Sequence, residues 1–226
     1  MKPDYLWHCL ETADQVAQAA CVEILAAAKS AITERDKFKL VLAGGTTPEK
    51  VYRLLAQADA DWNKWFIYHG DERCLPVDHK DRNSFMAANA LLNHVPIPPA
   101  HIFNIPAELG PEQGAQHYAK VVADALPFDL VLLGMGEDGH TASLFPGHQH
   151  NLDDLTHAVY NSPKPPPERV SISAKALSNA QQVIFLITGA NKRDAIKLWC
   201  ADTALPITTI HTDNMTIMID SDASSD

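Results

Sequence analysis

The segment FDLVLLGMGEDGHTASLFPG, residues 128–147, decides the fold of this chain. Its apolar run over 130–133 does not alternate with polar residues, which indicates a strand buried on both faces, and the run stops at glycines and acids. In open parallel sheets, ligands bind outside the carboxyl ends of the strands, so Glu137, Asp138 and His140 are expected at a functional edge. His140 is the candidate acid or base, because histidine titrates near neutral pH. The alternative is a structural histidine satisfied by a carbonyl in a tight turn.

The same segment contains the pattern GxGxxG at Gly134, Gly136 and Gly139. A dinucleotide-binding site would need a full helix after the third glycine and an acidic residue at the end of a second strand. Pro146 and Gly147 stop any helix that starts near residue 141. We therefore expect no dinucleotide, and no other cofactor.

Composition favours one compact domain that handles a small molecule. The 226 residues are 46% hydrophobic, enough for one substantial core, which we place at 1–220 with 221–226 as a frayed tail. The formal net charge of -10 repels nucleic acids and anionic membranes unless one patch reverses the sign locally. The expected partner is a small metabolite, and the expected assembly is a monomer or a weak homodimer.

The ends of the chain and its thiols favour a cytoplasmic protein. Asp4, Glu11 and Asp14 occupy the place of the basic region of an export signal, and no apolar run approaches the ~20 residues of a membrane span. The cysteines form no CxxC pair and are expected to be free thiols in a reducing compartment. They are Cys9, Cys21, Cys74 and Cys200.

Helical and extended patterns alternate along the whole chain. Helices are expected over 11–34, from Pro48 after a cap at Thr46 or Thr47, after residues 83–84, from Pro111 and from residue 191. Strands are expected at 38–43, 65–68, 101–105, 130–133, 170–172, 183–188, 206–211 and 216–219. This order predicts an α/β fold: a Rossmann-like, mostly parallel sheet with helices on both faces, in a single domain.

Three polar features fall at the ends of these strands. Gly44 and Gly45, the glycine turn, precede a helix whose free N–H groups favour a phosphate. The alternative is an ordinary strand-to-helix turn that needs glycine only for its backbone conformation. The charged run 71–73 follows a buried strand and is either functional or a set of surface ion pairs. Lys192 lies in the first turn of a helix, where the helix dipole favours an acidic residue over a cation. A lysine there either binds an anion nearby or is simply solvated.

Five segments, in this order, resemble one known family. They are AGGTTPEKVY (43–52), GDERCLPVDHKDRNS (70–84), GMGEDGHTASLFPG (134–147), SPKPPPERV (162–170) and TGANKR (188–193). Together they resemble the glucosamine-6-phosphate isomerase/6-phosphogluconolactonase family over nearly the whole chain. The resemblance implies a Rossmann-like fold and, in the lactonase branch, cofactor-free hydrolysis of 6-phosphogluconolactone in the oxidative pentose phosphate pathway.

Two alternatives belong to the same fold. The isomerase/deaminase branch carries a glutamate where this chain has Phe145, followed by Pro146, and a phenyl ring cannot transfer a proton. A catalytically silent sugar-phosphate sensor would not need Asp71, Arg73 and His140 together. The sequence therefore favours the lactonase.

Lactone hydrolysis needs an activated water, a stabilised oxyanion and a proton for the leaving oxygen. We assign the first and third roles to His140. Asp71 is expected to orient or electrostatically support it, and Arg73 to bind either the oxyanion or the phosphate. Because no GxSxG elbow is present, water is expected to attack directly.

Substrate binding is expected from a wider set of residues. The glycine turn supplies backbone N–H groups, and the matching family motifs supply two cations and two polar side chains. No metal is expected, because His148 and His150 lack further partnered ligands. The predicted binding residues are Gly44, Gly45, Thr46, Asn83, Ser143, Arg169 and Lys192.

Overall fold

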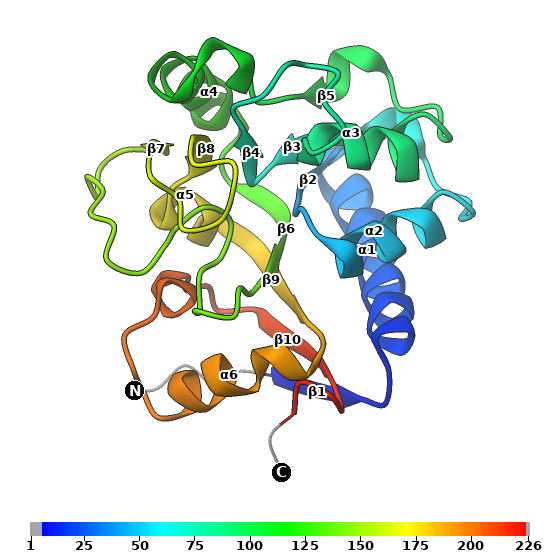
Figure 1. Ribbon diagram of the computed structural model, residues 1–226. Helices are drawn as coiled ribbons and strands as arrows, with labels where there is room; N and C mark the ends of the chain where they lie inside the picture. Colours follow the sequence, from blue (N-terminus) through cyan, green and yellow to red (C-terminus); the bar gives the residue numbers. More distant parts are fainter. Residues whose placement is uncertain (1–5, 225–226) are drawn as a thin grey trace.

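The computed structural model describes residues 6–224 and contains a seven-stranded sheet in which every strand pair is parallel (Figure 1). The strand order is β1-β10-β9-β6-β2-β3-β5. The bounds are β1 Leu6–Leu10, β2 Phe38–Leu42, β3 Trp65–His69, β5 Ile102–Phe103, β6 Phe128–Gly134, β9 Ala180–Ile187 and β10 Met215–Asp220. The predicted central strand is therefore present as β6, in the middle of the sheet.

A second sheet of three antiparallel strands stands beside the first, in the order β4-β8-β7. It consists of β4 Asp71–Arg73, β8 Arg169–Ile172 and β7 Thr156–Val159. The register pairs Asp71 with Ser171 and Arg73 with Arg169. The strand expected at 170–172 thus lies outside the parallel sheet, and it joins two charged segments that are far apart in sequence.

Helices cover both faces of the parallel sheet, as predicted (Figure 1). One core contains residues of α1, α2 and α3, and the other contains residues of α4, α5 and α6. Thr12 and Gln15 form a capping box that starts α1. The helices are α1 Ala13–Arg35, α2 Thr46–Leu55, α3 Asn83–Ala87, α4 Pro111–Ala125, α5 Ala174–Ser178 and α6 Arg193–Cys200.

Several local predictions were wrong. α2 begins at Thr46 with Gly45 as its cap residue, at φ +112°, so neither threonine caps it by a side-chain hydrogen bond. Residues 206–209 form a 3₁₀ turn closed by the Thr208 hydroxyl, and β1 occupies the sheet edge beside β10 instead. The expected frayed tail begins as a turn over 221–223 with Ala223 buried, and residues 225–226 lie outside the described part.

One helix also contradicts the expectation that no segment is long and apolar enough to span a membrane. α1 meets that requirement by length and composition. In the structure one side of α1, including Val16, Ala20 and Ile24, is buried in the core shared with β2 and α2. This is the packing of a core helix.

The topology creates a crevice between β2 and β6. From β2 the chain proceeds through β3 and β5 to one side, then returns to β6 and continues through β9 and β10 on the other side. β2 and β6 are paired directly, with Leu40 opposite Leu130. At such a switch point the loops after the two strands diverge and leave room for a ligand. The glycine turn and the loop that carries His140 therefore meet there.

Candidate active site

A cavity of about 300 Å³ lies at this switch point. It is lined by residues from the glycine turn, β4, the loop after β6, the proline-rich segment before β8 and the start of α6. Eight of the predicted residues line it: Gly44, Gly45, Asp71, Arg73, Asn83, His140, Arg169 and Lys192. Thr46 and Ser143 do not, since Thr46 lies at a neighbouring cavity and Ser143 is fully buried behind Asp71.

His140 is paired with an acidic residue of its own loop. Its Nδ1 lies 2.5 Å from Oδ1 of Asp138, whose carboxylate also accepts the backbone N–H of His140. A carboxylate at Nδ1 holds the proton on that nitrogen and leaves Nε2 as the acceptor. Burial lowers the pKa of His140 below its ordinary value, although Asp138 and Asp71 act to raise it. The ring is therefore neutral at pH 7 and suited to accept a proton.

The position of the imidazole depends on two neighbours. A Cβ on Gly136 would lie only 2.0 Å from Nδ1 of His140, so only glycine leaves room for the ring. On the other side, the ring of Phe145 packs against His140 with 4.6 Å between centroids. Gly136 of the GxGxxG pattern thus makes room for the histidine, and Phe145 packs on the ring from another side.

Asp71 does not orient His140, which corrects one of the roles proposed from sequence. Its Oδ2 accepts the Ser143 hydroxyl at 2.6 Å, and its Oδ1 accepts Nδ2 of Asn83 at 3.0 Å. Asp138 makes the orienting contact, and sequence reasoning placed Asp138 at the edge without giving it this role. Asp71 still supports His140 electrostatically, because its charge acts to raise the pKa of the imidazole.

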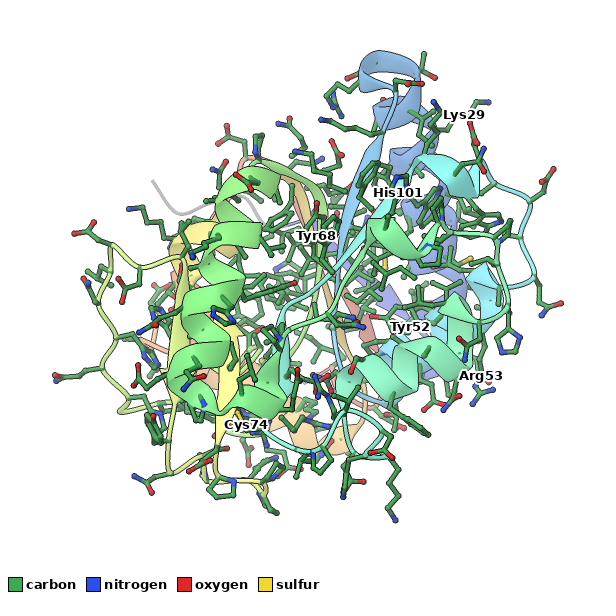
Figure 2. The ribbon with its side chains drawn as sticks, turned by 90° about the horizontal axis from the view of Figure 1, so that it is seen from above. Lys29, Tyr52, Arg53, Tyr68, Cys74 and His101 are labelled. Carbon is green, nitrogen blue, oxygen red and sulfur yellow. The ribbon has the colours of Figure 1, made fainter. Side chains whose placement is uncertain are left out.

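The glycine turn is closely fitted to its surroundings. A Cβ on Gly44 would lie 2.1 Å from the side-chain oxygen of Asn83, so the backbone can approach this amide only without a side chain. Tyr52 of α2, labelled in Figure 2, is fully buried, accepts the Ala43 N–H and donates to the Ala43 carbonyl just before the turn. The start of α2 is thereby held against the cavity, where its free N–H groups favour an anion.

Four cationic residues line the cavity, in a protein whose net charge is negative: Arg73, Lys164, Arg169 and Lys192. Burial and the nearby charge of Lys164 lower the pKa of Lys192. Lys164 also lines the cavity, and it was not predicted as a binding residue although it lies in the SPKPPPERV segment. Its ammonium group pairs with the carboxylate of Glu137 at 3.6 Å. Nε of Arg73 is covered and has no hydrogen-bond partner within residues 6–224. Clustered and partly desolvated cations of this kind are stabilised by a bound anion.

Arg169 is committed mainly to the protein. Its guanidinium donates to the carbonyls of Lys164, Pro165 and Pro166 and to the Ser143 hydroxyl, and it lies 3.9 Å from Asp71. These bonds hold the proline-rich segment in place over the cavity. Arg169 therefore presents less free hydrogen-bonding capacity to a ligand than Lys192 does.

His148 and His150 pack against other rings and do not form part of a set of metal ligands within residues 6–224. His150 stacks on His157 with 4.2 Å between ring centroids, and His148 packs near Phe145. Within residues 6–224 no group of three or more His, Cys, Asp or Glu side chains is placed to hold a metal ion.

The fold and the cavity define an α/β protein with a cation-lined cavity beside a paired histidine and aspartate. Residues 11–219 match the family described as glucosamine-6-phosphate isomerases/6-phosphogluconolactonase. The chain belongs to this family, and the resemblance deduced from the five segments is confirmed.

Individual relatives come from the lactonase branch. A 6-phosphogluconolactonase of Synechocystis sp. is 41% identical over 175 residues, which cover 74% of this chain and 72% of the relative. A probable chloroplastic 6-phosphogluconolactonase of Oryza sativa subsp. indica is 34% identical over 188 residues, 75% of this chain but 58% of the relative. The crystal structure of a 6-phosphogluconolactonase from Thermotoga maritima superposes with a TM-score of 0.89 at 30% identity, covering 96% of this chain and 99% of that one. The predicted fold class is confirmed.

Proposed function

We propose that this chain hydrolyses 6-phospho-D-glucono-1,5-lactone to 6-phosphogluconate, a reaction of the oxidative pentose phosphate pathway. The observation that carries the proposal is the Asp138–His140 pair facing a cavity lined by cations. The lactonase names of the relatives at 30–41% identity support the same substrate.

His140 would act first as a base and then as an acid. Asp138 keeps the Nδ1 proton in place, so Nε2 accepts a proton from water as the water oxygen attacks the lactone carbonyl. The tetrahedral oxyanion then collapses, the bond to the ring oxygen breaks, and the imidazolium returns its proton to that oxygen. Water is consumed, one acid and one hydroxyl group are formed, and neither a covalent intermediate nor a cofactor is required.

The phosphate would be held by charge rather than by shape. Lys192 and Lys164 supply two ammonium groups, and the turn at Gly44 and Gly45 supplies the start of α2. Arg73 is placed to bind either the phosphate or the oxyanion. Arg169, Asn83 and Ser143 would organise these walls through Asp71 and the proline-rich segment.

The residue at position 145 disfavours sugar-phosphate isomerisation. Phe145 is buried, with its ring against His140, at the place where the isomerase branch carries a glutamate. Its apolar ring can neither accept nor donate the proton needed to open a sugar ring. A silent sensor would bind the same anion without turnover, and an activity assay separates these possibilities.

Replacement of the histidine is the direct test. His140→Ala should reduce the enzymatic rate by ~10²–10⁴-fold, the usual contribution of acid–base catalysis. His117→Ala is the matched control, because it removes an exposed histidine of α4 outside the cavity and should retain the wild-type rate. A folded His140→Ala variant with near-normal kcat would refute the assignment.

A further inference from the structure

Glu72 is buried between two residues that line the cavity, and no function has yet been attached to it. It lies at the centre of β4, where successive side chains point to opposite sides. Asp71 and Arg73 both line the cavity, whereas Glu72 is 0% exposed and turned into the protein. A carboxylate in such a place is stable only if it is paired and hydrogen-bonded.

The carboxylate of Glu72 joins β4 to the start of α3. Oε1 accepts the backbone N–H groups of Arg73 at 2.8 Å and Asn83 at 2.7 Å, and Oε2 accepts the N–H of Ser84 at 2.8 Å. The buried guanidinium of Arg82 lies 3.3 Å from Oε2. The loop between these two points begins at Cys74, labelled in Figure 2, and ends at Arg82. One side chain thus fixes both ends of the loop.

Two routes connect this carboxylate to the cavity. The first is direct, since Glu72 holds the backbone of Arg73. The second runs through Asn83, whose Nδ2 donates to the carbonyl and to the carboxylate of Asp71 at 2.9 and 3.0 Å. The Asn83 side chain also packs against Cα of Gly44, so a displacement of α3 would reach the glycine turn as well.

Glu72 carries its charge in the folded protein. Burial would raise its pKa, but the electrostatic effect of His69 and the hydrogen bonds from Ser84 and Arg73 lower the pKa below the ordinary value. An amide of the same shape has one acceptor oxygen instead of two, so it would turn an NH₂ group towards at least one of the N–H donors.

We propose that Glu72 is a positioning residue for substrate binding: its carboxylate fixes Arg73 directly, and Asp71 and Gly44 through Asn83, without touching the substrate. This inference rests on the proposed function and names a residue on which that site depends.

A double-mutant cycle separates positioning from a general loss of stability. Glu72→Gln should lower kcat/KM for the phosphorylated lactone by about 10- to 100-fold, mainly by raising KM, because charge-assisted bonds to the binding wall are lost. In an Arg73→Ala background the same substitution should cost at least about fivefold less, because the side chain that the first route positions is already absent. Equal losses in both backgrounds, or no loss in the wild type, would overturn the proposal.

Asp129→Asn is the matched control for this cycle. Asp129 is also buried, accepts the backbone N–H of Lys39 at 2.7 Å and pairs with Arg35, but it lies at the opposite end of β6. It should lower the thermal midpoint and show the same small effect on kcat/KM in both backgrounds.

Two further measurements keep the test decisive. If Glu72→Gln does not fold, Glu72→Asp, which keeps the charge and retracts it by one methylene, replaces it in the same cycle with the same criteria. If the wild-type protein does not hydrolyse the lactone, the proposed function fails by itself. The cycle is then measured as the dissociation constant of 6-phosphogluconate, and additive effects there would overturn the role of Glu72 independently.

Discussion

Replacement of Asp138 by asparagine tests the chemistry of the site more finely than removal of the histidine does. The change keeps the size of the side chain but removes the negative charge from the contact with Nδ1 of His140. The side chain of His140 is 15% exposed and that of Asp138 is 35% exposed, so the contact is partly shielded from water. A hydrogen bond to a charged group in such a place contributes ~1.5–3 kcal/mol, which corresponds to a factor of ~10–100 in rate. Loss of the correct tautomer raises the cost further, so we expect kcat/KM to fall by ~10²–10⁴-fold.

The pH dependence of the variant has a defined sign. In the wild type, activity requires the neutral imidazole, so kcat/KM falls as the pH drops through the pKa of His140. Burial holds that pKa below its ordinary value, and Asp138 acts to raise it. Removing the charge of Asp138 therefore lowers the pKa further, and the acid limb of the profile should move to lower pH.

The assay is a pH series of kcat/KM from proton release on freshly generated lactone, corrected for spontaneous hydrolysis. Asp153→Asn is the control, because it removes a charge from an exposed aspartate that pairs with Lys175 and does not line the cavity. An unchanged rate in Asp138→Asn, or an acid limb that moves to higher pH, would refute the role given to Asp138.

Four other predictions follow from single features. Gly136→Ala should abolish most activity in a folded protein, because the new Cβ displaces the imidazole; unchanged kcat would contradict this packing. Lys192→Ala should raise KM for the phosphorylated lactone, by ~2–5 kcal/mol in binding if a buried contact is lost, and should affect unphosphorylated gluconolactone much less; equal losses on both substrates would exclude a phosphate contact. The pKa of buried His157 is lowered from 6.5 to about 4, so the unfolded state binds the proton first and stability falls by up to ~3 kcal/mol as the pH drops from 6.5 to 4; urea unfolding of His157→Phe should show less of this fall. Exhaustive chelation should leave turnover unchanged, and activity lost on EDTA treatment and restored by one divalent ion would show that a metal is involved.

The sequence predicted those parts of the fold that depend on local patterns. The run over 130–133 is apolar without alternation because β6 is buried on both faces, and that property is visible without coordinates. β1 was missed because it is a short strand whose partner, β10, lies at the other end of the described chain. β7 was missed because it is a four-residue strand that pairs with β8 across the proline-rich segment. The small sheet arises from the pairing of 71–73 with 169–171, and nothing in either segment alone indicates an antiparallel partner.

The candidate site was likewise predicted in part from local motifs, while its remaining contacts depend on the folded structure. The motifs predicted that His140, Arg73 and Lys192 lie close together, because the ends of parallel strands share one edge of a sheet. All three line one cavity in the structure. The choice between Asp71 and Asp138 as partner of the histidine depends on a turn that places Asp138 beside Nδ1, which only coordinates show. The burial of Ser143, the bonds that occupy Arg169 and the inward direction of Glu72 are likewise properties of packing.

The measurement that tests the central claim most directly is proton release from freshly generated 6-phosphogluconolactone by the purified wild-type protein. Spontaneous hydrolysis is subtracted, and glucosamine 6-phosphate, together with fructose 6-phosphate plus ammonium, serves as the control for isomerase/deaminase activity. The Asp138–His140 pair and Phe145 predict fast release from the lactone and no conversion of either control substrate. Conversion of glucosamine 6-phosphate, or a lactone rate no greater than the spontaneous one, would contradict the account.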